Sequence, residues 1–283
     1  MTPLRIDAHQ HFWRYDPAEY GWIDDSLAAL KRDFLPADVQ PLMTAAGFDG
    51  CVAVQARQTE EETRWLLSLA DAHPFILGVV GWVDLTAPDV AARLERLAHR
   101  RLVGIRHIVQ AEPDGFLARE DVRRGIAALE RCRLAFDMLV YARQLPDAAA
   151  FAAAFPRHRL VLDHLGKPDI RGDGFNVWYR EVRRLAALPH VCAKLSGLVT
   201  EAHWATWTPE TLRPYIHAAL DCFGADRLMI GSDWPVCTVA GDYEAVTAAV
   251  ADAVSALSAA ERDAVLGVTA QRFWNLSRVE ERA

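Results

Sequence analysis

Short apolar segments recur along the whole chain and predict eight buried β-strands. The segments are continuously hydrophobic rather than alternating, as strands buried on both faces are. They span residues 4–8, 50–55, 76–83, 102–108, 135–141, 160–164, 191–195 and 227–230. Stretches with helical periodicity lie between them, over residues 60–72, 88–100, 121–132, 146–155, 175–187, 209–223 and 242–257.

This alternation of strands and helices predicts βαβ units and a parallel sheet. Eight such units in 283 residues match the size of a TIM barrel. The predicted fold class is therefore α/β, a single (β/α)8 TIM-type barrel, with one domain over residues 1–283. A doubly wound open sheet is the competing fold, but no Gly-x-Gly-x-x-Gly follows the first strand, which disfavours its dinucleotide-binding form.

Composition narrows the range of partners and compartments. The net charge of −7 favours neither a nucleic acid nor a membrane as a partner. Five cysteines, an odd number without Cys-x-x-Cys spacing, indicate a reducing environment, and the N-terminus lacks the apolar stretch of a signal peptide. We therefore expect a cytoplasmic protein that acts on a small molecule. The oligomeric state stays open, and a homo-oligomer is one outcome.

The segment from residue 12 to about residue 36 carries no clear element but is rich in aromatic side chains. It contains Trp13, Tyr15, Tyr20 and Trp22. Long loops with aromatic residues often cover active sites. We expect either such a cover above the first strand or a packed extension of the core.

Polar or aromatic side chains follow the end of every predicted strand. Catalytic residues of TIM barrels lie at the carboxyl ends of the strands, and buried charges are costly unless they are paired or used. The side chains at these ends are His9, His11, Gln55, Arg57, Trp82, Asp84, Arg106, His107, Tyr141, Arg143, Asp163, His164, Lys194, Ser196, Ser232, Asp233 and Trp234. The eight ends together predict an active site.

The direction of each side chain follows from strand alternation. His9 and His11 are two residues apart, so they point to the same side of a strand and can share a metal ion or a substrate. Asp163 precedes His164 directly and is expected to point away from it. At most one of Arg106 and His107 can face the barrel centre.

Other polar residues near the strand ends have simpler explanations. We expect Arg57 and Arg143 on the surface and Asp84 as a helix cap. The role of His203, in the loop after the seventh strand, stays open.

Several of these motifs resemble the amidohydrolase superfamily. The resemblance rests on the His-x-His of strand 1, a histidine ending a mid-barrel strand, and the aspartate of Gly-Ser-Asp-Trp-Pro at residues 231–235. Within the superfamily, Asp-Ala-His-Gln-His-Phe-Trp (7–13), Gly-Ile-Arg-His (104–107), Asp-His-Leu-Gly-Lys-Pro (163–168) and Lys-Leu-Ser-Gly-Leu (194–198) look like the sugar-lactone hydrolase branch. That branch comprises the fuconolactonase and rhamnonolactonase group, related to 2-pyrone-4,6-dicarboxylate lactonase.

The resemblance implies a distorted barrel that hydrolyses a lactone ring. Asp233 would activate water, with His9, His11 and His164 around it as catalytic partners. The same four residues form a plausible mononuclear set for a divalent cation such as zinc. No lysine or glutamate bridges two metals at the expected strand ends, so a binuclear site is not expected and the single ion itself is dispensable in one reading.

The predicted substrate-binding residues are Arg106, His107, Lys194, Trp82 and Trp234. An aromatic-rich mouth with few cations fits a neutral sugar lactone, such as L-fuconolactone, better than a dicarboxylate lactone. Three alternatives stay open. They are a dicarboxylate lactone hydrolase, a zinc-dependent decarboxylase of an unsaturated or aromatic acid, and a barrel that binds a small ligand without turnover.

Overall fold

The computed structural model describes residues 3–172 and 174–277, and within them eight parallel strands form the predicted barrel. The strands pair in sequence order from β1 to β8. Their bounds are β1 Ile6–Gln10, β2 Gly50–Val54, β3 Ile76–Gly81, β4 Leu102–His107, β5 Ala135–Met138, β6 Leu160–Leu162, β7 Val191–Leu195 and β8 Leu228–Ile230. Every predicted strand is present, but β3, β5 and β6 each end two or three residues earlier than expected.

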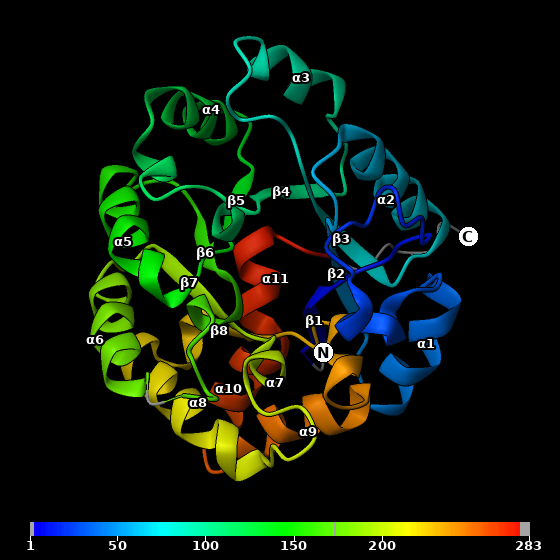
Figure 1. Ribbon diagram of the computed structural model, residues 1–283, viewed down its shortest axis with the longest axis vertical. Coiled ribbons are helices and arrows are strands. Elements are labelled where there is room, and N and C mark those ends of the chain that lie inside the picture. The colour runs from blue at the N-terminus through cyan, green and yellow to red at the C-terminus, as the bar shows by residue number, and fades with distance from the viewer. Residues whose placement is uncertain (1–2, 173, 278–283) are drawn as a thin grey trace.

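Most of the helices lie around the outside of the strands (Figure 1), whereas α7 lies in the loop after β7 and α11 at one end of the barrel. The helices are α1 Pro36–Ala45, α2 Glu60–Ala72, α3 Val90–Arg96, α4 Glu120–Arg131, α5 Leu145–Ala154, α6 Phe175–Ala186, α7 Leu198–Glu201, α8 Pro209–Phe223, α9 Tyr243–Ala253, α10 Ala259–Asp263 and α11 Thr269–Trp274. The seven predicted helices are all present. Helical periodicity did not predict α1, α7, α10 and α11. Helix α1 begins with proline, a residue suited to the first helical position. None of the helices described is long and apolar enough to cross a membrane.

Helix α11 closes the amino-terminal end of the barrel (Figure 1). Its Phe273 and Trp274 belong to a buried apolar cluster with the inward side chains of the strands, including Ile6 and Val52. Gly267, shortly before α11, approaches β1 so closely that a Cβ atom would lie 1.8 Å from the carbonyl oxygen of Leu4. Apolar side chains therefore fill the amino-terminal half of the barrel interior. Polar side chains can gather only at the carboxyl-terminal end of the strands.

The aromatic segment between β1 and α1 packs as an extension of the core. Trp13 and Phe34 form an antiparallel bridge, and the Trp13 side chain is fully buried against the rings of Tyr20 and Phe34. Phe34 in turn packs edge-on against Trp234 after β8, with ring centroids 5.3 Å apart. The segment therefore supports the loop after β8, in agreement with the packed-extension interpretation.

A buried carboxylate joins the first strand to the last. The Oδ1 atom of Asp7 accepts hydrogen bonds from the backbone amides of Ser232 and His9, at 2.9 and 3.2 Å. Its Oδ2 atom accepts from the Ser232 hydroxyl at 2.6 Å and the Tyr243 hydroxyl at 3.0 Å. Burial raises the pKa of Asp7 to about 6, although these hydrogen bonds oppose the rise. Asp7 thus ties β1, the loop after β8 and α9 together.

We expect Asp7→Ala to lower the free energy of unfolding by about 3–5 kcal/mol, because several buried donors lose their acceptor at about 1–3 kcal/mol each. Urea unfolding followed by tryptophan fluorescence measures the change. Asp263→Ala, at an exposed position of α10, is the matched control and should leave the midpoint almost unchanged. A loss below about 1 kcal/mol for Asp7→Ala would contradict this role.

Candidate active site

The two histidines of β1 point to the same side, as their spacing predicts. Their Nε2 atoms lie 3.2 Å apart. The Nδ1 atom of His11 lies 2.8 Å from the carbonyl oxygen of Val54, to which it donates its proton. The Nε2 atom of His11 faces the other site residues.

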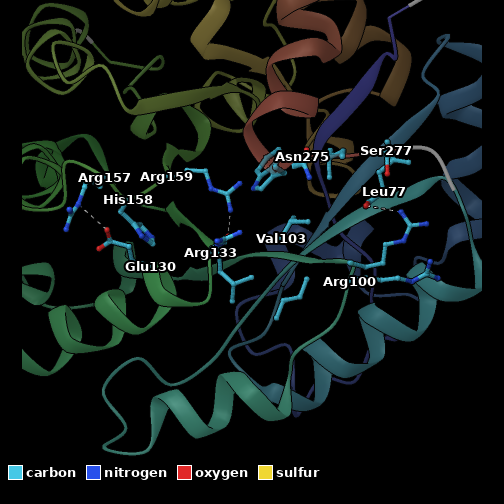
Figure 2. Close-up of a pocket in the computed structure, with 15 residues that line it drawn as sticks. Leu77, Arg100, Val103, Glu130, Arg133, Arg157, His158, Arg159, Asn275 and Ser277 are labelled. Carbon is cyan, nitrogen blue, oxygen red and sulfur yellow. Dashed lines mark hydrogen bonds and ion pairs between the residues drawn. The ribbon is translucent and has the colours of Figure 1, made fainter. Parts of the chain in front are cut away.

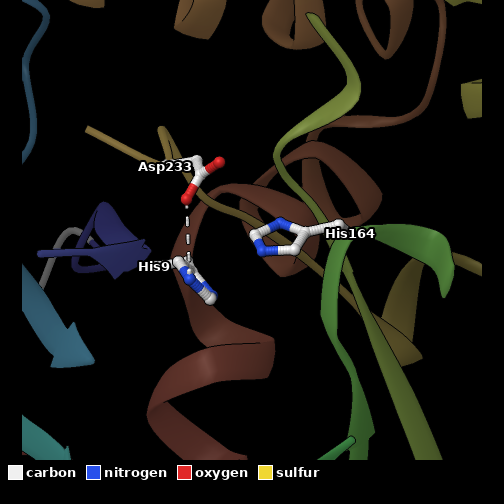
Figure 3. Close-up of side chains that lie close together, drawn as sticks. All are labelled: His9, His164 and Asp233. Carbon is white, nitrogen blue, oxygen red and sulfur yellow. Dashed lines mark ion pairs between the residues drawn. The ribbon is translucent and has the colours of Figure 1, made fainter. Parts of the chain in front are cut away.

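His164, shortly after β6, and Asp233, shortly after β8, lie beside His9 (Figure 3). The Oδ1 atom of Asp233 lies 3.3 Å from Nε2 of His11 and 3.7 Å from Nε2 of His9. The ring centroids of His9 and His164 are 4.5 Å apart. Nδ1 of His164 lies 2.9 Å from the Ser196 hydroxyl, which sets the orientation of the ring. All four residues are buried, so one carboxylate sits among three imidazoles.

Both His164 and Asp233 have backbone conformations that ordinary residues seldom adopt. Their φ angles are 52° and 57°, and Leu165 has a φ of 51°. Such left-handed residues cost about 1–3 kcal/mol each and persist where the surrounding structure enforces them, often at functional sites. These backbone conformations turn the side chains of His164 and Asp233 toward the other site residues.

A fully buried group of charges lies directly beside His9. Nζ of Lys194 contacts Oδ2 of Asp137 at 2.5 Å, Oδ1 of Asp163 at 2.9 Å and Nδ1 of His9 at 3.1 Å. Nη1 of Arg106 lies 3.3 Å from Oδ2 of Asp163 and 3.3 Å from Nε2 of His9. Two carboxylates therefore balance two cations, as buried charges require. We call Arg106, Asp137, Asp163 and Lys194 the charged floor.

These surroundings set the protonation of the site. Burial lowers the pKa of His9 well below its usual range, and the Lys194 ammonium adds to this effect. Burial also lowers the pKa of His164 to about 4. Burial alone would raise the pKa of Asp233, but His164, His11 and His9 outweigh it and hold the pKa well below the usual range. At pH 7 the site thus presents an ionised carboxylate and at least two neutral imidazoles.

The expected direction of Asp163 is wrong. β6 ends at Leu162, and the chain then turns through the left-handed residues His164 and Leu165. Strand alternation no longer holds there, so Asp163 and its neighbour His164 both reach the barrel interior. Strand alternation does hold on β4, where Arg106 contacts His9 and His107 does not share that contact.

The five predicted substrate-binding residues lie in different places. Lys194 is 0% exposed and belongs to the charged floor, and Trp234 packs against Phe12 and Phe34 with 2% of its surface exposed. Arg106 is also in the floor. Trp82 donates from Nε1 to Nδ1 of His107 at 3.3 Å, so these two residues form one group at the carboxyl ends of β3 and β4.

The other polar residues at strand ends have local partners. Arg57 pairs with Glu19, and Arg143 pairs with Asp114 on the surface. Asp84 accepts from the backbone amide and the hydroxyl of Thr86, at 2.9 and 2.7 Å, and His203 is exposed.

Asp137, the carboxylate closest to Lys194, was not among the predicted site residues. We expected β5 to continue to Tyr141, which places Asp137 inside the strand rather than at its carboxyl end. The strand ends at Met138, and Tyr141 is 40% exposed. The signal was a charged residue inside the otherwise apolar strand Ala-Phe-Asp-Met, which needs a buried partner.

A cavity of about 930 Å³ opens near the amino-terminal ends of β4 to β6, away from these residues (Figure 2). Arginines dominate its lining, but their donors hold the chain together. Arg101 donates to the carbonyl oxygen of Leu77, and Arg159 donates to those of Phe273 and Arg133. These contacts fasten strand ends to neighbouring segments, a stabilising role at this face of a barrel.

The cluster has the composition and geometry of a divalent cation site. His9, His164 and Asp233 each offer a ligand atom, and these atoms lie within 4.8 Å of one another. Space between them depends on Gly197, where a Cβ atom would lie 2.5 Å from Nδ1 of His164 and 3.2 Å from Oδ2 of Asp233. Two neutral imidazoles and a carboxylate fit zinc. His11, the fourth predicted ligand, contacts His9 and Asp233.

Known proteins resemble this chain over almost its whole length. The family model described as amidohydrolase matches residues 6–276. An L-fucono-1,5-lactonase of Burkholderia multivorans is 47% identical over 98% of this chain and 97% of its own. A similar enzyme of Burkholderia ambifaria is 43% identical over 85% of this chain and 83% of its own.

A solved structure shares the fold closely. The crystal structure of an amidohydrolase from Burkholderia multivorans with bound zinc has a TM-score of 0.95 and 46% identity, covering 97% of this chain and 100% of the other. A putative 2-pyrone-4,6-dicarboxylic acid hydrolase from Pseudomonas putida, at 23% identity, shares the fold with a TM-score of 0.76 over 97% of this chain and 98% of its own.

The charged floor generates a stability prediction. We expect Lys194→Met to lower the free energy of unfolding by about 3–5 kcal/mol, because Asp137 and Asp163 keep their burial and lose their shared cation. Adding Asp137→Asn should recover part of the loss, since Arg106 then balances Asp163 alone. Urea unfolding of the single and double variants measures both effects. Lys31→Met, at a surface ion pair, is the control, and equal losses for it and Lys194→Met would contradict the prediction.

Proposed function

The chain belongs to the amidohydrolase family, and from this premise we propose that it opens the ester ring of a sugar lactone, with L-fucono-1,5-lactone as the substrate. The observation that carries the proposal is the ionised Asp233 carboxylate held among three imidazoles at the carboxyl ends of the strands. Two relatives above 40% identity that are L-fucono-1,5-lactonases support the choice of substrate.

Asp233 is the general base of the proposed reaction. Its carboxylate takes a proton from water, and the water oxygen attacks the lactone carbonyl carbon. The electrons of the C=O double bond move to the oxygen and form a tetrahedral oxyanion. When the oxyanion collapses, the bond to the ring oxygen breaks, and the protonated Asp233 returns its proton to the leaving alkoxide. The carboxyl product then ionises in water.

The histidines and Arg106 stabilise the charge that develops on the carbonyl oxygen. Donors fixed in a buried site act on such an oxyanion more strongly than water does, because they need no reorganisation. Arg106 brings a permanent positive charge to within 3.3 Å of His9. Lys194 supports the same histidine from its other nitrogen, so it acts through His9 as a positioning residue.

The same residues would hold one divalent cation such as zinc, with His9, His164 and Asp233 as ligands and His11 beside them. The relative that contains bound zinc supports this assignment. When bound, the cation would polarise a carbonyl oxygen or lower the pKa of water. The permanent charges of Arg106 and Lys194 supply part of that field without it.

A neutral substrate is favoured over a dicarboxylate lactone. Recognition of two carboxylates calls for several converging arginines. Arg57 and Arg143 are engaged by Glu19 and Asp114, and Arg106 pairs with Asp163. This pairing leaves little free positive charge for an acid substrate, which also weighs against the decarboxylase alternative.

We also infer one domain over residues 1–283 and a cytoplasmic location. The family match over residues 6–276 supports the first inference. The five cysteines, all unpaired, support the second, because disulfides are rare in a reducing compartment.

Replacing Asp233 by Asn tests the base. We expect kcat for lactone opening to fall by about 10²- to 10⁴-fold, the usual worth of a general base, because the amide cannot take the proton. A pH indicator follows the acid released from L-fuconolactone. Asp263→Asn is the control and should keep full activity. Near-normal turnover by Asp233→Asn would rule out the assignment.

Metal analysis tests the cation site. After chelation and dialysis, we expect the wild type to take up one equivalent of zinc, measured by elemental analysis. His164→Ala should lose this uptake because one ligand is missing, whereas the exposed His203→Ala should retain it. Uptake that is unchanged in His164→Ala would show that zinc binds elsewhere. Lactone opening by the stripped wild type at its full rate would show that turnover does not need the ion.

A further inference from the structure

Lys167 and Glu201 form a second polar pair beside the active site. Lys167 follows the left-handed turn after β6, and Glu201 is the last residue of α7, after β7. Nζ of Lys167 lies 3.8 Å from Oε1 of Glu201, which is too far for a hydrogen bond. Their side chains are 17% and 22% exposed. The two groups attract each other and still leave donors and acceptors for a ligand.

Short connections tie this pair to the residues of the proposed chemistry. The backbone amide of Lys167 donates to the carbonyl oxygen of His164 at 2.8 Å. Glu201 lies four residues after Gly197. A Cβ atom added to Gly197 would lie 3.2 Å from Oδ2 of Asp233. The pKa of Glu201 is consistent with a position near Asp233. Burial raises the pKa of Glu201, and the Asp233 carboxylate adds to the rise.

Neighbouring residues hold α7 and Lys167 in place. Arg171 donates from Nε to the carbonyl oxygen of Ala202 at 2.8 Å and from Nη2 to that of Thr200. The Thr200 hydroxyl lies 2.7 Å from the carbonyl oxygen of Gly197 and 3.4 Å from Oε1 of Glu201. Lys167 itself lies over the ring of Tyr141, 5.4 Å from its centroid. The Glu201 carboxylate is therefore held at the end of a turn that these hydrogen bonds fix in place.

We propose that Lys167 and Glu201 form the subsite that binds the hydroxyl groups of the sugar ring. A hydroxyl between them accepts a hydrogen bond from the ammonium and donates one to the carboxylate. The exposed ring of Tyr141 offers an apolar surface for a carbon face of the sugar. This inference rests on the proposed lactonase activity and names its substrate class. The opposite charges of Lys167 and Glu201 balance each other, so the subsite suits neutral polyhydroxylated lactones.

A pair of lactones separates this role from others. L-fuconolactone carries hydroxyl groups, whereas δ-valerolactone has the ester ring alone. We expect Glu201→Leu and Lys167→Met to lower kcat/KM for L-fuconolactone by about 10- to 100-fold, the usual worth of hydrogen bonds to charged groups. For δ-valerolactone the change should stay within about 3-fold, since no hydroxyl contact is lost. Glu201→Gln, which keeps an acceptor, should fall between Glu201→Leu and the wild type.

Controls and contrary outcomes are distinct. Glu210→Gln, an exposed position of α8, should leave both rates unchanged. Equal losses on the two lactones would assign the pair to catalysis or to folding and overturn the subsite, and so would unchanged rates on both. Glu201→Leu and Lys167→Met could show no difference between the two lactones while Asp233→Asn still lowers the turnover of both. In that case the proposed function stands and only the subsite is overturned. A wild type that opens neither lactone would overturn both.

Discussion

The closure of the sheet between β1 and β8 is the contact on which the active site depends. The backbone amide of Asp233 donates to the carbonyl oxygen of His9 at 2.8 Å, and that of His11 donates to the carbonyl oxygen of Trp234 at 2.6 Å. The proposed base Asp233 is thus hydrogen-bonded through its backbone to His9, and its neighbour Trp234 is bonded in the same way to His11. Asp7 reinforces the same seam from within the protein. Side chains held this directly keep the geometry that catalysis needs.

The charged floor shows how a barrel interior can hold ionised groups beneath a catalytic centre. Nζ of Lys194 lies 5.2 Å from the centroid of the Trp274 ring of α11. Lys194 therefore stands between the apolar side chains at the amino-terminal end of the barrel and the polar side chains at the carboxyl-terminal end. Burial makes each of its charges costly alone, and the close pairing with Asp137 and Asp163 offsets that cost. Burial and the Lys194 ammonium hold the pKa of His9 well below its usual range, against the opposing effect of Asp163. The group that balances these buried charges therefore also affects the pKa of His9.

The rule that side chains alternate along a strand predicted the direction of some site residues correctly and of others wrongly. It placed His9 and His11 on one side, and the structure agrees, although the pairing of β1 with β2 shifts register between Asp7 and Gln10. It failed for Asp163 because β6 is only three residues long and ends in a left-handed turn. Asp137 was missed for a related reason, since β5 was expected to run three residues further than it does. A strand's end is set by contacts with its neighbours, which hydrophobicity alone does not encode.

The sequence by itself determined the barrel, its strand order and the residues that carry the proposed chemistry. Continuous apolar runs, helical periodicity and polar strand ends depend on local composition and can be recognised without coordinates. Only the tertiary structure decided which polar residues are paired, which are buried and which face a substrate. Lys194 illustrates the division: its sequence position marks it as a site residue, but its three contacts come from β1, β5 and the end of β6. Those partners are 31 to 185 residues away along the chain, and only the closed sheet brings them together.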